Sequence, residues 1–332
     1  MKTIKWKYND TFSPIDEDIV IAIGNFDGVH KGHRKLLEKA KNKAIENDLP
    51  FGVVTFDPHP RDFFSSKNSS FKLLDPEEKE CQLKNLGADY LIIINFNEEL
   101  KNCSSNQFLS DILHKTFRVK IMFAGSNFKF GKNREGTIAG SKKYANKIGL
   151  EIEGVDLAQI KSLESEHDTE LKIISSQAIR SLIQDGKLNA AEDLLGRKWC
   201  VTGTVIKGKQ QGRELGFPTA NVDMHYFLKP PFGVYVTRLK IISQNTLDEQ
   251  SEWLPSISNI GTRPTVSGAS VNIETHIIDF KNNNTDTDLY GKRIKIELLT
   301  FIRPEKKFNS LSELKDQIEI DTQNACDFHK LK

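Results

Sequence analysis

The feature that most constrains the fold is a change in hydrophobic pattern between the two halves of the chain. In the first half, runs of consecutive apolar residues alternate with segments whose apolar residues recur at helical spacing. The apolar runs occupy residues 18–23, 51–56, 90–96, 120–124, 150–155 and 171–174. Strands that are apolar throughout and connected by helices indicate a parallel sheet covered on both faces. We therefore expect residues 1–186 to form a doubly wound, Rossmann-like α/β domain.

The second half, residues 187–332, is predicted to be a small β-barrel or sandwich with a terminal helix. Its β-rich runs are separated by clusters of Gly, Pro and Asn, and they occupy residues 198–206, 233–242, 254–259, 271–280 and 293–301. Two polar segments, 243–252 and 281–288, are expected to be hairpin tips or crossings. A helix from Ser310 to about Phe328 is expected to cover an open end of the β domain with Leu311, Leu314, Ile318 and Ile320.

Composition excludes several classes of protein. The 332 residues suffice for two domains, and 47 basic residues balance 45 acidic ones to a net charge of +2. This balance removes the electrostatic argument for a nucleic-acid or anionic-membrane partner, and no apolar run approaches the roughly 20 residues of a membrane helix. The four cysteines lie far apart without a C-x-x-C pair, which favours a reducing, cytoplasmic location over a disulfide framework or a thiolate zinc site.

The segment Gly24–His33 (GNFDGVHKGH) lies where a predicted strand turns into a predicted helix. Backbone N–H groups and the helix dipole favour an anion at such a position. The glycines at 24, 28 and 32 let the backbone approach a phosphate, and His30 and His33 can donate hydrogen bonds to it. The glycine spacing differs from G-x-G-x-x-G, so a hydride-transfer enzyme is disfavoured. Two ordinary surface histidines are the alternative, and Asp27 stays open as a metal ligand although no third ligand supports zinc.

A second phosphate contact is predicted at Ser175–Arg180 (SSQAIR), which follows a strand and begins a helix. A Ser-Ser pair by itself is most often a helix cap. Together with the H-x-G-H segment, which resembles the nucleotidylyltransferase superfamily, Ser175, Ser176 and Arg180 become candidates for holding a triphosphate. Arginine suits this task because its guanidinium can bind phosphate oxygens with two parallel hydrogen bonds.

The second half contains a separate candidate site for a nucleotide. Residues 203–210 (GTVIKGKQ) come close to a P-loop, but Gln210 replaces the Ser or Thr that would hold magnesium. In residues 212–221 (GRELGFPTAN), Gly212 and Gly216 permit a tight turn, and Thr219 and Asn221 offer the oxygen ligands that Mg²⁺ prefers. A well-formed β-turn with a capped end is the alternative explanation.

Taken together, these motifs resemble the bacterial bifunctional riboflavin kinase and FAD synthetase family. The first half carries GNFDGVHKGH, TFDPHP (55–60), GSNFKFG (125–131) and ISSQAIR (174–180), with Gln177 where the family has Thr. The second half carries PTAN (218–221), GVY (233–235), SNIGTRPT (258–265), IETHI (273–277), DLYG (288–291) and FIRPEKKF (301–308). The resemblance spans nearly the whole chain in the family's order.

The resemblance implies an FMN adenylyltransferase domain over 1–186 and a riboflavin kinase barrel over 187–332. Riboflavin and ATP would give FMN, and FMN and ATP would then give FAD, with Mg²⁺ as the metal and no nucleic-acid or membrane partner. The implied catalytic residues are Glu274, as the base, with His30, His33 and Arg180. The implied nucleotide and flavin contacts are Gly24, Phe26, Asp27, Gly28, Gly32, Asn127, Ser175, Ser176, Gly212, Arg213, Gly216 and Arg303. The implied metal ligands are Thr219 and Asn221, and His276 is expected to serve packing or hydrogen bonding.

Three other functions remain open at this level. The chain could transfer a nucleotide to a different phosphorylated alcohol, it could be a flavin sensor without turnover, or it could be a kinase alone if adenylyl transfer is absent. Nucleic-acid binding has only the scattered basic residues of 132–147 in its favour, and that segment is better explained as a solvated loop and helix face.

Overall fold

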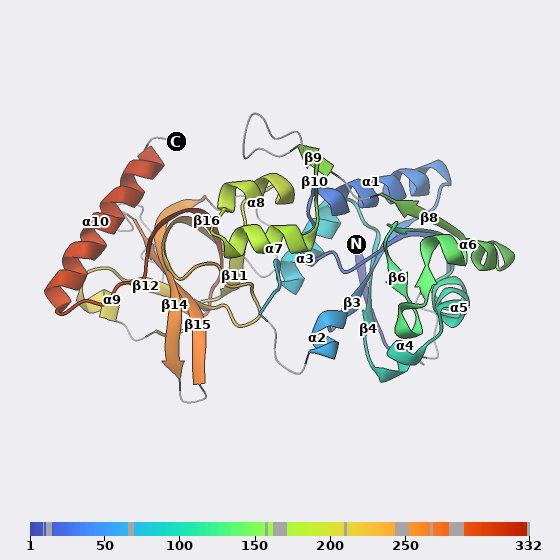
Figure 1. Ribbon diagram of the computed structural model, residues 1–332, viewed down its shortest axis with the longest axis horizontal. Coiled ribbons are helices and arrows are strands. Elements are labelled where there is room, and N and C mark those ends of the chain that lie inside the picture. Colours follow the sequence, from blue (N-terminus) through green and yellow to red (C-terminus); the bar gives the residue numbers. More distant parts are fainter. Residues whose placement is uncertain are drawn as a thin grey trace. The chain divides into compact units, whose positions relative to one another are not determined.

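The computed structural model describes residues 1–8, 10, 15–65, 70–156, 159–161, 171–208, 211–242, 252–265, 268–278 and 289–330. The expected loop at 281–288 and nearly all of the one at 243–252 lie outside these residues. The chain divides into two compact units (Figure 1). The first unit is Met1–Ser69 with Pro76–Ser176, and the second is Ser70–Asp75 with Gln177–Lys332. The division thus falls earlier than the expected boundary after residue 186, and a short segment of the first half belongs to the second unit.

The first unit is built on a parallel sheet, as five of the six apolar runs predict, whereas the run at 171–174 forms a strand of a separate antiparallel pair. Its six strands follow the order β1-β4-β3-β2-β5-β8, and every neighbouring pair is parallel. The strands are β1 (Lys2–Trp6), β2 (Ile19–Ile23), β3 (Phe51–Asp57), β4 (Tyr90–Asn95), β5 (Val119–Gly125) and β8 (Glu151–Val155). Because β2 lies between β3 and β5, the strand order reverses beside β2. In doubly wound sheets, ligands bind at the carboxyl ends of the strands at such a point.

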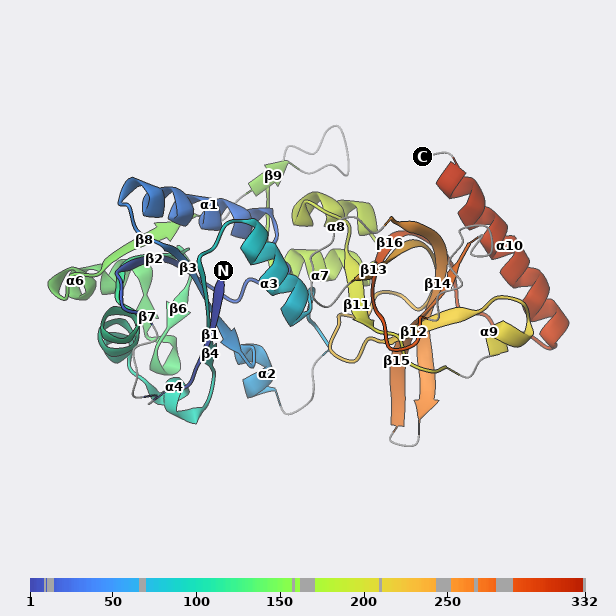
Figure 2. The same ribbon diagram turned by 180° about the vertical axis from the view of Figure 1, so that it is seen from behind.

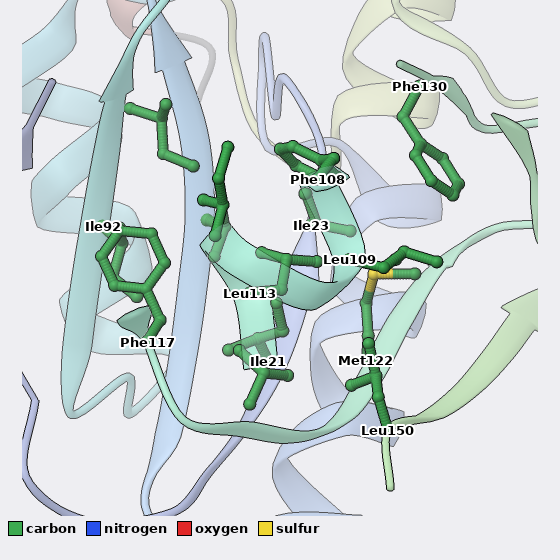
Figure 3. Packing of buried hydrophobic residues seen from close by; sticks show 14 of the residues in the cluster. Ile21, Ile23, Ile92, Phe108, Leu109, Leu113, Phe117, Met122, Phe130 and Leu150 are labelled. Carbon is green, nitrogen blue, oxygen red and sulfur yellow. The ribbon is translucent and has the colours of Figure 1, made fainter. Parts of the chain in front are cut away.

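Helices pack on this sheet and supply much of its core. The longer ones are α1 (Lys31–Glu46), α3 (Pro76–Asn85), the π-helical η1 (Phe108–Thr116) and α6 (Ile138–Lys147). Figure 3 shows Phe108, Leu109 and Leu113 of η1 packed against strand residues such as Ile21 and Met122. The short elements are α2 (Pro60–Phe64), α4 (Glu98–Asn102), α5 (Ser105–Gln107), η2 (Lys132–Arg134), the pair β6 (Lys129–Phe130) and β7 (Gly136–Thr137), and the pair β9 (Gln159–Lys161) and β10 (Leu171–Ile173).

The second unit is an antiparallel barrel-like sheet, again as predicted. Its strand order is β11-β16-β13-β14-β15-β12. The strands are β11 (Cys200–Thr204), β12 (Thr219–Asp223), β13 (Gly233–Ile242), β14 (Leu254–Thr265), β15 (Gly268–Ile277) and β16 (Arg293–Pro304). A bridge between Ile206 and Asn221 links the two edges, with the Ile206 N–H donating to the Asn221 carbonyl at 2.9 Å. Figure 2 shows the ends of β14 and β15 projecting beyond the other strands.

The helices of the second unit are α7 (Ser176–Gln184), which starts at the last residue of the first unit, α8 (Leu188–Leu195), α9 (Gln211–Glu214) and α10 (Leu311–Lys330). The terminal helix α10 was predicted, but its packing face was wrong in part. Leu311 and Ile320 are 64% and 56% exposed, while Asp321 and Ala325 are buried. Ala325 joins a cluster with Val234, Val236 and Ile257, which face outward from β13 and β14. The helix therefore packs on the side of the barrel.

The segment Ser70–Asp75 is held in the second unit by specific contacts. Lys72 forms a parallel bridge with Phe227, and the Trp199 Nε1–H donates to the Leu73 carbonyl at 3.0 Å. Asp75 is buried and forms an ion pair with Arg293 at 3.0 Å. No sequence pattern predicts that Ser70–Asp75 belongs to the second unit, because these contacts join residues far apart along the chain. Within the described residues, no helix has the length and apolar character needed to cross a membrane.

Candidate active sites

The turn after β2 holds an unusual backbone conformation. Phe26, Gly28 and Val29 have φ angles of 49°, 88° and 40°, all in the left-handed region. That region is unfavourable for a bulky residue and especially for a β-branched one. Phe26 and Val29 are both fully buried, so packing holds them in place. Strained backbone that is fixed in this way is characteristic of functional sites.

Two histidines lie together at the start of α1. His30 is buried and caps the helix, and its Nδ1 accepts a hydrogen bond from the His33 backbone N–H at 3.2 Å. The two rings stack with centroids 3.5 Å apart, and the Phe26 ring packs edge-on against His33 at 5.3 Å. Because Nδ1 of His30 is an acceptor, the neutral ring carries its proton on Nε2. The pair thus offers an oriented N–H donor at a helix N-terminus.

Gly32 leaves little room for a side chain in this arrangement. A Cβ at this position would lie 3.2 Å from the His30 ring and 3.3 Å from the Ile174 carbonyl oxygen. The same neighbourhood brings in the serine segment, since the Ser176 Oγ donates to the Asp27 carbonyl at 2.8 Å. The structure therefore brings together the H-x-G-H turn and the start of α7, as the sequence predicts for two phosphate contacts.

The remaining predicted contacts of the first half have different surroundings. Arg180 belongs to the second unit, where its Nε donates to the Phe71 carbonyl at 3.0 Å and its guanidinium lies 5.0 Å from the Phe71 ring centroid. Asn127 is exposed just beyond β5, next to β2 in the sheet. Gln177, which replaces the family's Thr, is exposed. Ser175 is half-buried beside Ser176.

An aromatic cluster at the carboxyl ends of β3 and β4 was not predicted. Phe63 and Phe64 of α2 lie 5.2 and 5.8 Å from Phe96, and Phe56 lies 6.1 Å from the same ring. Phe64 is 62% exposed, although it is a large apolar residue. The sequence signal was the Phe-Phe pair that follows TFDPHP at a strand end. The exposed ring of Phe64, in contact with half-buried rings, offers a surface for a planar ligand at this edge of the sheet.

In the second unit, three of the predicted site residues, Asn221, Glu274 and Arg303, share one cross-strand row, while Thr219 pairs with His276 two residues away. Asn221 pairs with Glu274, Glu274 with Asn259, Asn259 with Val234, and Val234 with Arg303. Side chains directly opposite one another on neighbouring strands project from the same face of a sheet. Val234 packs with residues of α10, so this face is the outside of the barrel. Along the row, the residues follow the order Asn221, Glu274, Asn259, Val234 and Arg303. Of these polar residues, Asn259 was not predicted as a site residue.

The metal-ligand candidates fit a hard cation. Asn221 is 3% exposed, and its Oδ1 is buried without a hydrogen-bond partner among the described residues. Its Nδ2 makes a long contact of 3.4 Å to the Thr219 hydroxyl. A Cβ at Gly208 would lie 3.0 Å from this Oδ1, so glycine there leaves room for it. Amide and hydroxyl oxygens suit Mg²⁺. Among the described residues, no group of three or more His, Cys, Asp or Glu side chains could hold a metal.

Glu274 is half-buried between Asn221 and Asn259, two residues from His276 on the same strand face. The His276 Nδ1–H donates to the Pro218 carbonyl at 2.9 Å, and its ring packs edge-on against Phe217 at 5.3 Å. Burial lowers the pKa of His276 below its ordinary value of 6.5. The prediction that His276 serves packing and hydrogen bonding is confirmed, and it anchors the backbone just before Thr219.

The glycine turn before this strand is as tight as predicted. The Phe217 N–H donates to the Gly212 carbonyl at 2.6 Å, and a Cβ on Gly212 would lie 2.4 Å from the Phe217 oxygen. Gly216 has a φ of 91°. Arg213 lies in α9, and its side chain is outside what the structure describes.

The guanidinium of Arg303 is bound to a carboxylate of α10. Its Nε and Nη2 donate to Asp321 at distances of 2.7–3.1 Å, and its Nη1 donates to the Pro304 carbonyl at 3.0 Å. The guanidinium carbon lies 5.8 Å from the Phe308 ring centroid. No pattern in the sequence points to Asp321.

Comparison with known proteins agrees with the division into two catalytic halves. The family model described as FAD synthetase matches residues 12–167, and the one described as riboflavin kinase matches residues 195–329. A bifunctional riboflavin kinase/FMN adenylyltransferase from Escherichia coli strain K12 is 35% identical and covers 100% of this chain and 99% of its own. The protein of the same description from Bacillus subtilis strain 168 is 34% identical and covers 92% of this chain and 91% of its own.

A crystal structure described as a macrolide-efflux protein from Streptococcus pneumoniae superposes with a TM-score of 0.77 at 29% identity, and covers 97% of both chains. Its likeness extends over both units and supports the fold of each. The assignment to a family rests on the family models and on the relatives that match from end to end at more than 30% identity. The chain therefore belongs to the bifunctional riboflavin kinase/FMN adenylyltransferase family.

Proposed function

We propose that this chain phosphorylates riboflavin to FMN and then adenylylates FMN to FAD, with ATP as the second substrate of both reactions. The observation that carries the proposal is the end-to-end match to relatives described by both activities, with each half matching its own family model. We assign phosphorylation to the second unit and adenylyl transfer to the first. The domain limits of 1–186 and 187–332 belong to this proposal, so α7 is assigned to the adenylyltransferase domain although its residues from Gln177 onward lie in the second compact unit.

In phosphorylation, the terminal hydroxyl of the ribityl chain attacks the γ-phosphorus of ATP. A new O–P bond forms, the bond to the β-phosphate oxygen breaks, and ADP leaves. Glu274 accepts the hydroxyl proton, a role that suits a half-buried carboxylate next to the phosphate-binding residues. Thr219 and Asn221 would hold Mg²⁺, which neutralises charge on the triphosphate when bound. The unpartnered Oδ1 of Asn221 supports this assignment.

In adenylyl transfer, a phosphate oxygen of FMN attacks the α-phosphorus of a second ATP, and pyrophosphate leaves. The nucleophile is already an anion, so this step needs alignment and charge stabilisation rather than a strong base. His30 and His33, at the N-terminus of α1, supply hydrogen-bond donors. The bond from Ser176 to Asp27 holds the turn in position. The roles proposed for Arg180, Ser175 and Asn127 rest on the family resemblance.

The aromatic cluster around the exposed Phe64 supports a site for the flavin ring of FMN in the first unit. It lies at the carboxyl ends of β3 and β4, the same edge of the sheet as the H-x-G-H turn after β2. A flat, largely apolar ring system stacks well on exposed phenylalanine side chains. A cytoplasmic location fits a chain that consumes ATP and keeps all four of its cysteines free.

The test is a time course with purified full-length chain, riboflavin, ATP and Mg²⁺, in which riboflavin, FMN and FAD are separated by chromatography. FMN should rise and then convert to FAD. The Glu274→Ala variant should lose FMN formation by roughly 10²-fold or more, and His33→Ala should accumulate FMN. A folded chain that yields neither product would point to a flavin sensor or to a different alcohol substrate.

A further inference from the structure

In the ion pair between Arg303 and Asp321 the carboxylate is buried and the guanidinium is partly buried. Their side chains are 20% and 4% exposed, and Gln317 also donates to Asp321, from its Nε2 at 3.0 Å. A buried carboxylate is costly unless it is paired and hydrogen-bonded, so Asp321 depends on this guanidinium. A guanidinium has five N–H donors. Asp321 and the Pro304 carbonyl engage three of those of Arg303. The remaining two have no protein acceptor within the described residues.

The position of Arg303 in the cross-strand row determines which part of a bound substrate its two remaining N–H donors can contact. Asn221 and Glu274 lie on adjacent strands, whereas Arg303 is separated from Glu274 by β14 and β13. Three strand spacings amount to roughly 14 Å along the sheet. The reacting hydroxyl must contact Glu274, so Arg303 is too far along the row to contact the γ-phosphate. The substrate that can extend from Glu274 toward Arg303 is the flavin, through its ribityl chain and its ring.

The surroundings of Arg303 also suit a flavin ring. The guanidinium is planar, is held by a two-pronged pair and lies over the Phe308 ring at 5.8 Å. A planar cation of this kind can stack on an aromatic ring system and can donate to its carbonyl oxygens. The isoalloxazine ring of riboflavin provides both features.

We infer that Asp321 is a positioning residue for riboflavin binding, because it fixes the Arg303 guanidinium at the flavin end of the row. This inference rests on the proposed kinase function of the second unit. It builds on the ligand contact that the family resemblance implies for Arg303 and places that contact at the flavin ring. It also gives the terminal helix α10 a role in substrate affinity, since the carboxylate that orients Arg303 comes from that helix.

The experiment measures steady-state phosphorylation by the full-length chain and its Asp321→Asn variant, with riboflavin and ATP varied in turn. Asparagine keeps the size of the side chain but loses the negative charge and one of the two acceptor oxygens, so it holds the guanidinium less firmly. We expect the KM for riboflavin to rise at least tenfold, while the KM for ATP and kcat stay within about threefold. Adenylylation of supplied FMN, measured in the same preparations, should not change.

Two further variants separate positioning from folding. Arg303→Lys keeps a positive charge beside Asp321 but removes the planar fork, and it should raise the riboflavin KM to a similar degree. The double variant should be no worse than Arg303→Lys alone, because Asp321 acts through Arg303. Glu319→Gln is the matched control, since Glu319 and Lys315 form an exposed pair on the same helix at 3.9 Å. Its kinetics should equal those of the unaltered chain.

The inference is overturned if Arg303→Lys leaves the riboflavin KM unchanged, or if the ATP KM or kcat changes in its place. Effects of the two substitutions that add independently would also overturn it. If Asp321→Asn does not fold, as judged by circular dichroism, Arg303→Lys decides the question by itself. A failure of the proposed function would look different, because the unaltered chain would then form no FMN at all.

Discussion

Replacing Asn221 with leucine should stabilise the second unit and at the same time abolish riboflavin phosphorylation. Asn221 is 3% exposed, and its Oδ1 has no hydrogen-bond partner among the described residues. A buried polar atom left unpaired costs about 1–3 kcal/mol. Leucine has nearly the same branched shape as asparagine and no polar atom, so most of this cost should be relieved. For a unit of this size, the expected rise in Tm is roughly 2–10 °C.

The assay is differential scanning calorimetry, which can resolve the transitions of two units, together with the riboflavin phosphorylation assay. A matched control comes from Thr202, which is 2% exposed and whose Oγ1 also has no hydrogen-bond partner among the described residues. Thr202→Val should give a stabilisation of similar size and retain phosphorylation. Adenylylation of supplied FMN should survive in both variants.

Two results would contradict this role of Asn221: a lower Tm of the second unit in Asn221→Leu, or a phosphorylation rate within twofold of that of the unaltered chain. The first result would mean that the amide is satisfied in the folded protein. The second would mean that its oxygen holds no group that the reaction needs. If Asn221→Leu is more stable but inactive, the result indicates that the unpaired Asn221 oxygen lowers the stability of the unit and is retained because it binds a ligand.

Three further predictions address other parts of the two sites. Burial favours the neutral form of His276 and lowers its pKa from 6.5. Because the unfolded chain then binds this proton more readily, the contribution of His276 to stability is complete above pH 6.5 and is lost as the pH falls below that value. Riboflavin phosphorylation should decline accordingly in acid, and His276→Asn, which keeps a donor near Nδ1 but cannot titrate, should flatten this decline in a pH–rate profile. Ser176→Ala removes the 2.8 Å bond to Asp27; a loss of about 1 kcal/mol should slow FAD formation from FMN about fivefold in a single-turnover assay, and an unchanged rate would remove the serine from the site. Phe64→Ser should raise the KM for FMN without lowering Tm, since Phe64 is 62% exposed; an unchanged KM in steady-state assays would exclude the aromatic cluster as a flavin site.

The sequence predicts the fold where apolar residues are contiguous or regularly spaced. The strand β2 consists entirely of buried residues, so its apolar run identified it at once. The strand β1 was missed because only Ile4 and Trp6 are buried, with charged residues between and around them, as expected at the edge of a sheet. The insertion of Ser70–Asp75 into the second unit depends on contacts such as Lys72 with Phe227, which no local pattern encodes.

For the candidate sites, the sequence likewise predicts local motifs but not the contacts between distant residues. The motif around His30 and His33 predicted a turn between a strand and a helix, and the structure contains that turn. The left-handed φ angles of Phe26 and Val29 within it depend on burial, which the motif does not show. The relation between Asn221 and Glu274 could not be predicted, because strand register is set by the whole barrel. The face of α10 was wrong in part for the same kind of reason: Asp321 is buried only because Arg303 reaches it from β16, and periodicity counts a carboxylate as exposed.

The central claim is that one chain contains two separate active sites that act in sequence. The most direct test mixes two full-length variants, Glu274→Gln and His33→Ala, with riboflavin, ATP and Mg²⁺. We expect Glu274→Gln alone to form no FMN but to convert supplied FMN to FAD, and His33→Ala alone to stop at FMN. The mixture should convert riboflavin to FAD, because each variant retains the site that the other lacks. If the mixture forms no FAD, or if either substitution abolishes both reactions, the assignment of two independent sites is contradicted.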